Sequence, residues 1–243
     1  MKPYFHVATT CLLFLWGAFS GCATAKPAPA HHGAFFRTSW QPLYTASNGP
    51  RASAGTPQKS VNSNIANSID AFRAHVVVAA LQLYRESESA NHFGAVDIVR
   101  IFDRAGCNKC FAGINSVPAL VKEANRLHAY RSTDRPQPGD LILFHNQVDR
   151  NRNGQSDDWY TGVGVIIEIG RHTYIAITRT EGRLRKVYIT PDGPMVRTYN
   201  GETLNSFVKI ANPHDPVDAE YLAGQLYAGY VDTGIVYGRY PSN

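Results

Sequence analysis

Two hydrophobic periods divide this chain into an N-terminal group of predicted helices and a later group of predicted strands. Three stretches carry apolar residues at the spacing of one helical face, and short apolar runs bounded by Gly, Pro, Asn and Asp follow them. We predict helices over residues 68–84, from 91 or 93 to 106, and 116–127. Gly106 is a natural C-terminal stop for the second helix, and Ser116 is the expected N-cap of the third.

The apolar runs predict four strands, over residues 140–145, 163–169, 174–178 and 184–189. A long polar loop separates the first two strands, and Glu181-Gly182 forms the turn between the last two. Residues 204–210 lead into a further predicted helix over 218–230, with Leu222, Leu226 and Tyr227 on one face. This order predicts an α+β fold in which N-terminal helices pack on a small antiparallel sheet.

The first 21 residues have the pattern of an export signal, with a charge at Lys2 and a mostly apolar run over 7–19. That run is short for a membrane span. Phe19-Ser20-Gly21-Cys22 resembles a bacterial lipobox, in which the cysteine is diacylated and becomes the first mature residue. The resemblance predicts a lipoprotein anchored through Cys22, and alanine rather than aspartate at position 23 favours the outer membrane. A plain signal peptide cleaved nearby is the alternative.

The remaining chain divides by composition. Residues 22–67 are dense in Ala, Pro, Ser, Gly and Asn and predict a flexible tether, residues 68–235 a folded domain, and residues 236–243 a tail. The formal net charge is +5, and cleavage after residue 21 removes only one of the charged side chains, Lys2. This weak positive charge favours anionic envelope surfaces but forms no concentrated basic patch, so we expect no nucleic-acid partner.

Cys107 and Cys110 form a Cys-x-x-Cys pair. In an oxidising periplasm this spacing predicts a local disulfide. Thioredoxin-like chemistry would require a βαβ pattern beside the pair, and none is visible. Zinc would require two more ligands, for which His92 and His128 are the nearest candidates.

Three predicted helices followed by the sequence Pro-Gly-Asp-Leu-Ile-Leu-Phe at 138–144 resemble the NlpC-type cell-wall peptidases and their CHAP amidase relatives. The phrase from Tyr221 to Tyr230 also resembles the C-terminal part of lipoproteins in that family. The resemblance covers roughly Ser68 to Val231 and implies a papain-like α+β fold.

The same resemblance assigns the catalytic positions. In that family the second helix begins with Cys-Ser-Gly-Phe-Val and ends in Ala-Gly, which here places the nucleophile at Gly94. The second strand opens with His-Val-Gly, which places the base at Gly162, and the orienting polar residue falls at Ala176. A thiol at a helix N-terminus has a lowered pKa, and a histidine then pairs with it. None of these three residues can replace that chemistry, so the resemblance implies an emptied groove, wider than an active one.

The expected function is therefore binding or scaffolding in the cell envelope, with peptidoglycan stem peptides or a partner cell-wall hydrolase as the ligand class that the resemblance implies. The alternative is an active endopeptidase or amidase that uses other residues. His145 and Cys107 are the candidates for such a site.

The loop between the first two strands resembles a calcium-binding loop. Oxygen-bearing side chains recur at Asp149, Asn151 and Asn153, a glycine follows, and Asp157 or Asp158 can close the shell. The loop lacks a glutamate at its twelfth position, and strands flank it rather than helices. Calcium is thus a candidate cofactor, and a calcium-stabilised structural module is a third candidate function. The alternative is a turn-rich loop whose Asn, Asp and Gly satisfy local backbone geometry.

Overall fold

The structure, a computed structural model, describes residues 59–86, 93–213, 215 and 217–240. These residues form an α+β fold, as the sequence predicts. The helices are α1 (Lys59–Glu86), α2 (Ala95–Arg104), α3 (Val117–Arg126) and α4 (Thr233–Arg239). The strands are β1 (Tyr130–Arg131), β2 (Leu141–Phe144), β3 (Gly162–Ile169), β4 (Tyr174–Thr180), β5 (Arg183–Ile189), β6 (Thr198–Tyr199), β7 (Glu202–Thr203) and β8 (Tyr227–Val231).

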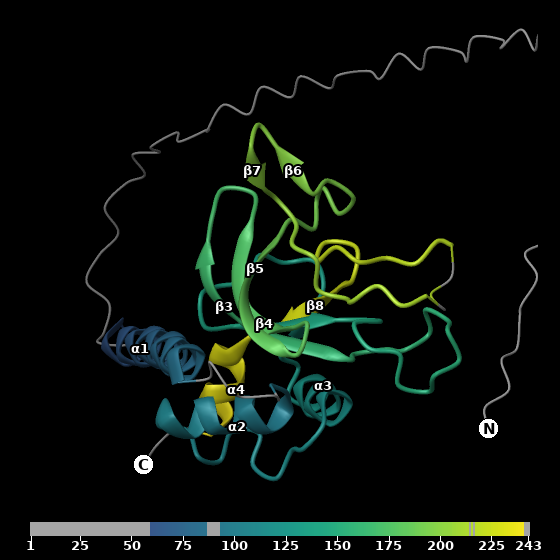
Figure 1. The fold of residues 1–243 in the computed structure, drawn as a ribbon. Helices are drawn as coiled ribbons and strands as arrows, with labels where there is room; N and C mark the ends of the chain where they lie inside the picture. Colours follow the sequence, from purple (N-terminus) through teal and green to yellow (C-terminus); the bar gives the residue numbers. More distant parts are fainter. Residues whose placement is uncertain (1–58, 87–92, 214, 216, 241–243) are drawn as a thin grey trace, which may run out of the picture. The chain divides into compact units, whose positions relative to one another are not determined.

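One antiparallel sheet of six strands, in the order β1-β8-β2-β3-β4-β5, organises the domain (Figure 1). The strands β6 and β7 pair separately as a small hairpin. In the centre of the sheet, Leu141 pairs with Val165 and Phe144 pairs with Gly162. The four strands predicted from the apolar runs are all present as β2 to β5, and Glu181-Gly182 forms the predicted turn between β4 and β5.

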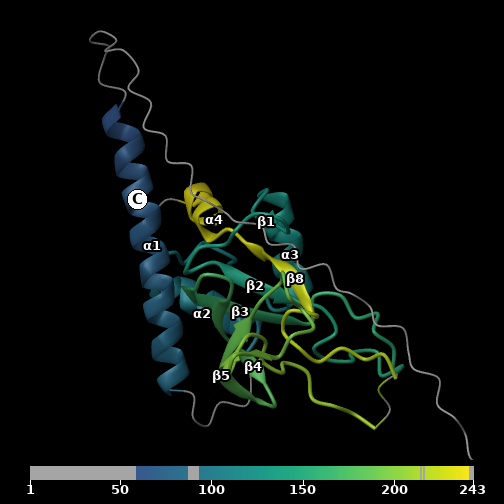
Figure 2. The same cartoon turned by 90° about the horizontal axis from the view of Figure 1, so that it is seen from above.

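The sheet is buried on both faces, because alternate residues of each strand enter different core clusters. Leu141 and Leu143 pack with the helices, whereas Ile142 and Phe144 pack with Val208 and other residues of the long segment that follows β5. Figures 1 and 2 show the long helix α1 running alongside the sheet. All four residues of β2 are fully buried, which explains why this strand reads as a continuous apolar run.

The first helix is longer than predicted. It begins at Lys59 rather than Ser68, inside the segment 22–67 for which the composition predicts a tether. No Gly or Pro interrupts the sequence from Lys59 to Glu86, so the helix can extend beyond the part that packs. The first buried side chain among its described residues is Phe72, and the apolar period therefore starts later than the helix.

The second and third helices are present, and the predicted start of the third is confirmed, whereas the second begins at Ala95 rather than at 91 or 93. Gly94 is the N-cap of α2, and Ser116 is the N-cap of α3 with a proline in the first turn. Cys107 and Cys110 form a disulfide just after α2, with their Cα atoms 5.4 Å apart.

The prediction of a helix over residues 218–230 is wrong. Residues 227–231 form β8, which lies between β1 and β2 in the sheet. Gly229 has a φ angle of +106°, which a right-handed helix does not allow. Leu222 and Leu226 precede this strand and are buried, and together with the apolar residues of β8 they produce a run that resembles one helical face.

The domain also extends past residue 235, where the predicted tail begins. The helix α4 runs to Arg239, and Val236 is fully buried in the core that the helices share with the sheet. The helix is only seven residues long, so its apolar residues are too few for a helical period to be recognised in the sequence.

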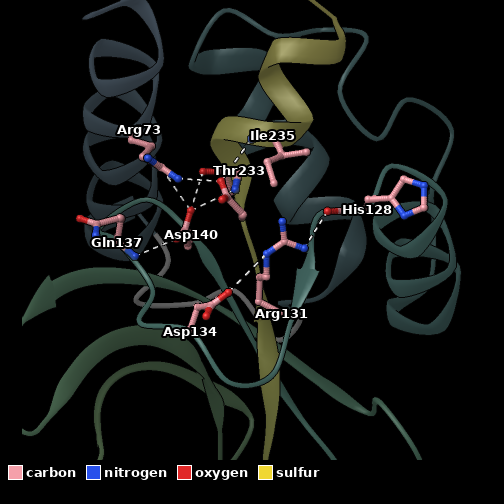
Figure 3. Close-up of polar contacts among 9 residues, drawn as sticks. Arg73, His128, Arg131, Asp134, Gln137, Asp140, Thr233 and Ile235 are labelled. Atoms are coloured by element: carbon pink, nitrogen blue, oxygen red, sulfur yellow. Dashed lines mark hydrogen bonds and ion pairs between the residues drawn. The ribbon is translucent and has the colours of Figure 1, made fainter. Parts of the chain in front are cut away.

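A buried carboxylate joins the start of β2 to two helices (Figure 3). One oxygen of Asp140, whose side chain is 1% exposed, accepts hydrogen bonds from the backbone N–H and the hydroxyl of Thr233, and its other oxygen accepts from Gln137 N–H. On α1, Arg73 places Nε 3.3 Å from Asp140 and donates from Nη2 to Asp232 at 2.6 Å. Burial raises the pKa of Asp140, and the positive charge of Arg73 opposes that rise.

We expect Arg73→Ala to destabilise the domain by about 3–5 kcal/mol, because it leaves a buried carboxylate without its cation. Urea denaturation followed by circular dichroism measures the change. The matched control is Arg104→Ala, which removes the exposed pair with Glu86 and should cost about 0–1 kcal/mol. Equal losses for the two variants would contradict the role we assign to Arg73.

Candidate functional site

A cleft of about 400 Å³ opens where α2 and β3 begin. We call it the α2–β3 cleft. Its lining comes from the start of α2, the loop after β2, the first residues of β3, the turn between β4 and β5, and part of the segment 208–215. Both Gly94 and Gly162 line it, so the structure brings together two of the three positions that the sequence resemblance assigns to catalysis.

Gly94 leaves open space in the cleft. Its backbone is extended, with φ −166°, and its N–H donates to the carboxylate of Asp97 at 3.0 Å in a capping box. A Cβ atom at this position would meet no other atom within 4 Å. The backbone conformation suits any residue, so the position offers room that a side chain could occupy without strain.

Gly162 is covered. A Cβ atom here would collide with Oε1 of Gln147, and it would lie 3.1 Å from Cβ of Phe144. The Gln147 side chain is fixed in this place, because its amide Nε2 donates to the carbonyl of Arg179 at 2.7 Å and its backbone N–H donates to Thr161 Oγ1 at 2.8 Å. The expectation of a wider groove at both glycines therefore does not hold at Gly162, where the Gln147 amide occupies the space that a side chain would take.

Ala176 does not belong to the cleft. It is fully buried in the core cluster that also holds Ile142 and Phe144, and it pairs with Ile166 and Val187, four residues along β4 from Thr180. The strand register pairs Gly164 with Thr178, and two residues further along β4 lies Thr180, which lines the cleft. Thr180, not Ala176, is the β4 residue beside Gly162. The resemblance placed the third position without knowledge of the β3–β4 register, which pairs Ala176 with Ile166 instead.

Two charged groups of the cleft neutralise each other. Lys209 Nζ lies 3.1 Å from Asp215 Oδ1, and the two side chains are only 7% and 8% exposed. Burial alone would raise the pKa of Asp215, but the N–H of Asn212 and the ammonium of Lys209 hold it below its usual value. Lys209 also lies 5.7 Å from the ring centroid of Tyr221.

The residues proposed for an alternative active site lie elsewhere. His145 accepts the Tyr160 N–H at Nδ1, its ring contacts Trp159, and burial lowers its pKa. Cys107 is buried and disulfide-bonded, so its sulfur is not a free thiol. The described residues that line the cleft include no cysteine, histidine or serine.

The polar loop after β2 is held by its own side chains. Asp149 Oδ2 accepts from Gly154 N–H at 3.0 Å, and Asn151 Oδ1 accepts from Asn153 N–H at 3.0 Å. The amide groups of Asn151 and Asn153 donate to the carboxylate of Asp157 at 3.2 and 3.0 Å. Asn151 and Asn153 therefore converge on Asp157 through their amide groups, while Asp149 binds the backbone of Gly154.

Asp158 connects this loop to the end of β2. Its Oδ2 accepts from Arg150 N–H at 2.9 Å, and its backbone N–H donates to Asn146 Oδ1 at 2.8 Å. Asp158 is buried and engaged in structure, which makes Asp157 the better placed of the two acids to face a cation.

One oxygen of the loop is unsatisfied. Asp149 Oδ1 is buried and has no hydrogen-bond partner among the described residues. Buried carboxylate oxygens without a partner are costly and call for an explanation. The described chain holds no group of three His, Cys, Asp or Glu side chains arranged for a metal ion, so a site here would depend on Asn amide and backbone oxygens as well.

Several sequence predictions fall outside the described residues. They are the export signal, the lipidated Cys22, most of the tether and His92. No helix in the described parts of the chain is long and apolar enough to cross a membrane. Comparison of the chain with protein-family models, curated proteins and solved structures gives no match in any of the three.

Sequence reasoning missed Gln147, Arg179 and Thr180. Gln147 reaches Gly162 only because the loop after β2 turns back toward β3, and no sequence pattern encodes that path. Arg179 follows the apolar run of β4 and stands between two threonines, so the sequence does not mark it as part of a site.

We expect Gly162→Ala to destabilise the domain by about 0.5–1.5 kcal/mol, because Gln147 must move and lose its hydrogen bond to Arg179. The destabilisation by Gly162→Ala should be smaller in a Gln147→Ala background. Thermal denaturation of the unmodified chain, the two single variants and the double variant measures this difference. Gly94→Ala is the control and should change stability by no more than about 0.5 kcal/mol. Equal effects at the two glycines would contradict the difference between the open and the covered position.

Proposed function

We propose that this chain is an envelope lipoprotein whose domain is a non-catalytic member of the papain-like NlpC and CHAP group, and that it binds peptidoglycan. The observation that carries the proposal is the α2–β3 cleft, which gathers the positions of nucleophile and base in one place. At those positions stand Gly94 and a glycine covered by Gln147.

The chemistry of the cleft supports binding over hydrolysis. An acyl-enzyme requires a nucleophile and a base in contact, and loss of such a nucleophile costs on the order of a million-fold in a comparable triad. The amide of Gln147 can donate and accept hydrogen bonds but cannot move a proton as imidazole does. A cleft with fixed polar groups and open space beside them is suited to holding a peptide.

The ligand class and the location follow from the resemblance. Peptidoglycan stem peptides are the ligands, and a partner cell-wall hydrolase is a further binding candidate. Acyl chains on Cys22 would hold the domain at the outer membrane, within reach of the cell wall, because two chains anchor far more firmly than one.

We expect the purified full chain, kept soluble in mild detergent, to be retained on isolated sacculi without releasing soluble muropeptides. Gly94→Phe should reduce retention roughly tenfold or more, the equivalent of about 1.4 kcal/mol, because the ring fills the open part of the cleft. Co-sedimentation measures retention, and chromatography of the supernatant measures release.

The control for this experiment is Val96→Phe, which adds the same ring to an exposed position on the same helix. It should leave retention unchanged. The proposal fails if the unmodified chain is not retained or if both phenylalanine variants bind as well as it does. Muropeptide release would instead support the enzymatic alternative.

A calcium-stabilised module is a second candidate function, favoured by the unsatisfied Asp149 Oδ1. The residues present fit a calcium ion in kind, since carboxylate and amide oxygens are its preferred ligands. Asp149, Asn151, Asn153 and Asp157 would hold it, and its charge would offset the cost of burying an unpaired oxygen. Three carboxylates in the loop indicate modest affinity. This function is compatible with peptide binding by the cleft.

We expect calcium to raise the melting temperature of the full chain and a chelator to lower it again, because an ion that binds only the folded state stabilises it. Asp149→Asn should remove the calcium dependence while keeping an oxygen for the Gly154 N–H. Asp192→Asn, an exposed acid outside the loop, is the control. A melting temperature that does not respond to calcium in the unmodified chain would exclude this candidate.

A further inference from the structure

Arg179 is a cation without an acidic partner in the described part of the cleft. The other lysine or arginine of the lining, Lys209, is paired with Asp215. Arg179 forms no ion pair with any described residue, although the acids Asp149 and Glu181 line the same cleft. Glu181 is engaged by Arg185 at 3.3 Å instead. The cleft therefore contains a guanidinium whose charge no described residue pairs.

The Nε atom of Arg179 is buried and has no hydrogen-bond partner among the described residues, while the residue as a whole is half-buried. A buried N–H donor that gains no protein acceptor destabilises the fold. Unsatisfied groups of this kind are few in native proteins, and each calls for an explanation. A ligand that accepts a hydrogen bond from this guanidinium would supply one.

Arg179 is placed where it can contact a ligand bound in the cleft. Its carbonyl accepts the hydrogen bond that holds Gln147 over Gly162, so the residue lies beside the covered glycine. The open space at Gly94 belongs to the same cleft, at the N-terminal end of α2, where the helix dipole also favours negative charge.

We infer that the α2–β3 cleft recognises a free carboxylate on a peptide and that Arg179 is the residue that binds it. The inference rests on the proposed function and names the group of the stem peptide that is recognised. A carboxylate matches the planar fork of a guanidinium with two parallel hydrogen bonds. A carboxamide of the same shape lacks the charge, so the cleft distinguishes the free acid from the amide.

A stem peptide offers two such carboxylates, one on its D-glutamyl residue and one at its C-terminus. The experiment uses the full chain in detergent and isothermal titration with the tetrapeptide L-alanyl-γ-D-glutamyl-L-lysyl-D-alanine. Two further peptides carry an amide in place of one carboxylate each. We expect one of the two amides to bind roughly ten- to a hundredfold more weakly, the range for a hydrogen-bonded charge.

Variants test whether Arg179 is the anchor. Arg179→Gln should lower the affinity for the free acid to that for the affected amide, and it should leave the affinity for the amide unchanged. Arg179→Lys should bind the free acid with an affinity between these two values, since lysine keeps the positive charge but not the planar guanidinium. Arg183→Gln removes the same charge from an exposed position of β5 and should leave both affinities unaltered.

The outcomes separate this inference from the proposed function. Equal affinity for the acid and both amides, or no binding of any of them, overturns the carboxylate site, and this arm needs no variant that might fail to fold. If the Arg179 variant still binds the amide more weakly than the free acid, another residue recognises the carboxylate. That result also overturns the inference. Retention on sacculi decides the proposed function independently.

Discussion

The buried carboxylate of Asp140 is the interaction on which the arrangement of the domain depends. It lies in the turn before β2 and binds groups from the starts of β2 and α4, while Arg73 brings α1 to the same point. The fit is close, since a Cβ atom at Gly139 would lie 2.7 Å from the carbonyl oxygen of Arg73. Three segments distant in the sequence are thereby placed together. Because β2 starts at this point, the network also sets where β2 ends and where the loop over the cleft begins.

The Asp140 network fixes how the helices are arranged on the sheet more than it adds to the free energy of unfolding. Burying the carboxylate costs free energy, as the raised pKa of Asp140 shows, and Arg73 recovers only part of that cost. The apolar clusters on the two faces of the sheet supply the driving force. Hydrophobic contacts tolerate sliding, whereas a carboxylate with four partners in fixed directions does not. The Pro-Gly-Asp turn is thus the reason that α1 and α4 meet the sheet at one defined place.

The sequence predicted those elements whose pattern is local. The strands around Pro138-Gly139 and the polar loop have their own turn residues and apolar runs, and β2 and β3 match them. The helix prediction over residues 218–230 failed because buried residues of a non-helical connection and of β8 happen to follow a helical spacing. The place of Gly94 could be predicted, since a helix start is local. The contents of the cleft could not, because Gln147 and Arg179 meet through a hydrogen bond between segments 32 residues apart.

The two glycines of the cleft look identical in the sequence but differ in their surroundings. Gly94 faces open space, where a Cβ atom would meet no other atom within 4 Å. Gly162 differs, because Gln147 fills its space with a hydrogen-bonded amide held by Thr161 and by the Arg179 carbonyl. Filling a space with a satisfied polar group is how a binding surface is built. The loop that carries Gln147 is the one that holds Asp149. An ion at Asp149 would restrict the backbone two residues from Gln147 and so reduce the entropy lost when a peptide binds in the cleft. Metal binding by the loop and peptide binding by the cleft would then reinforce each other, each gaining from the order that the other imposes.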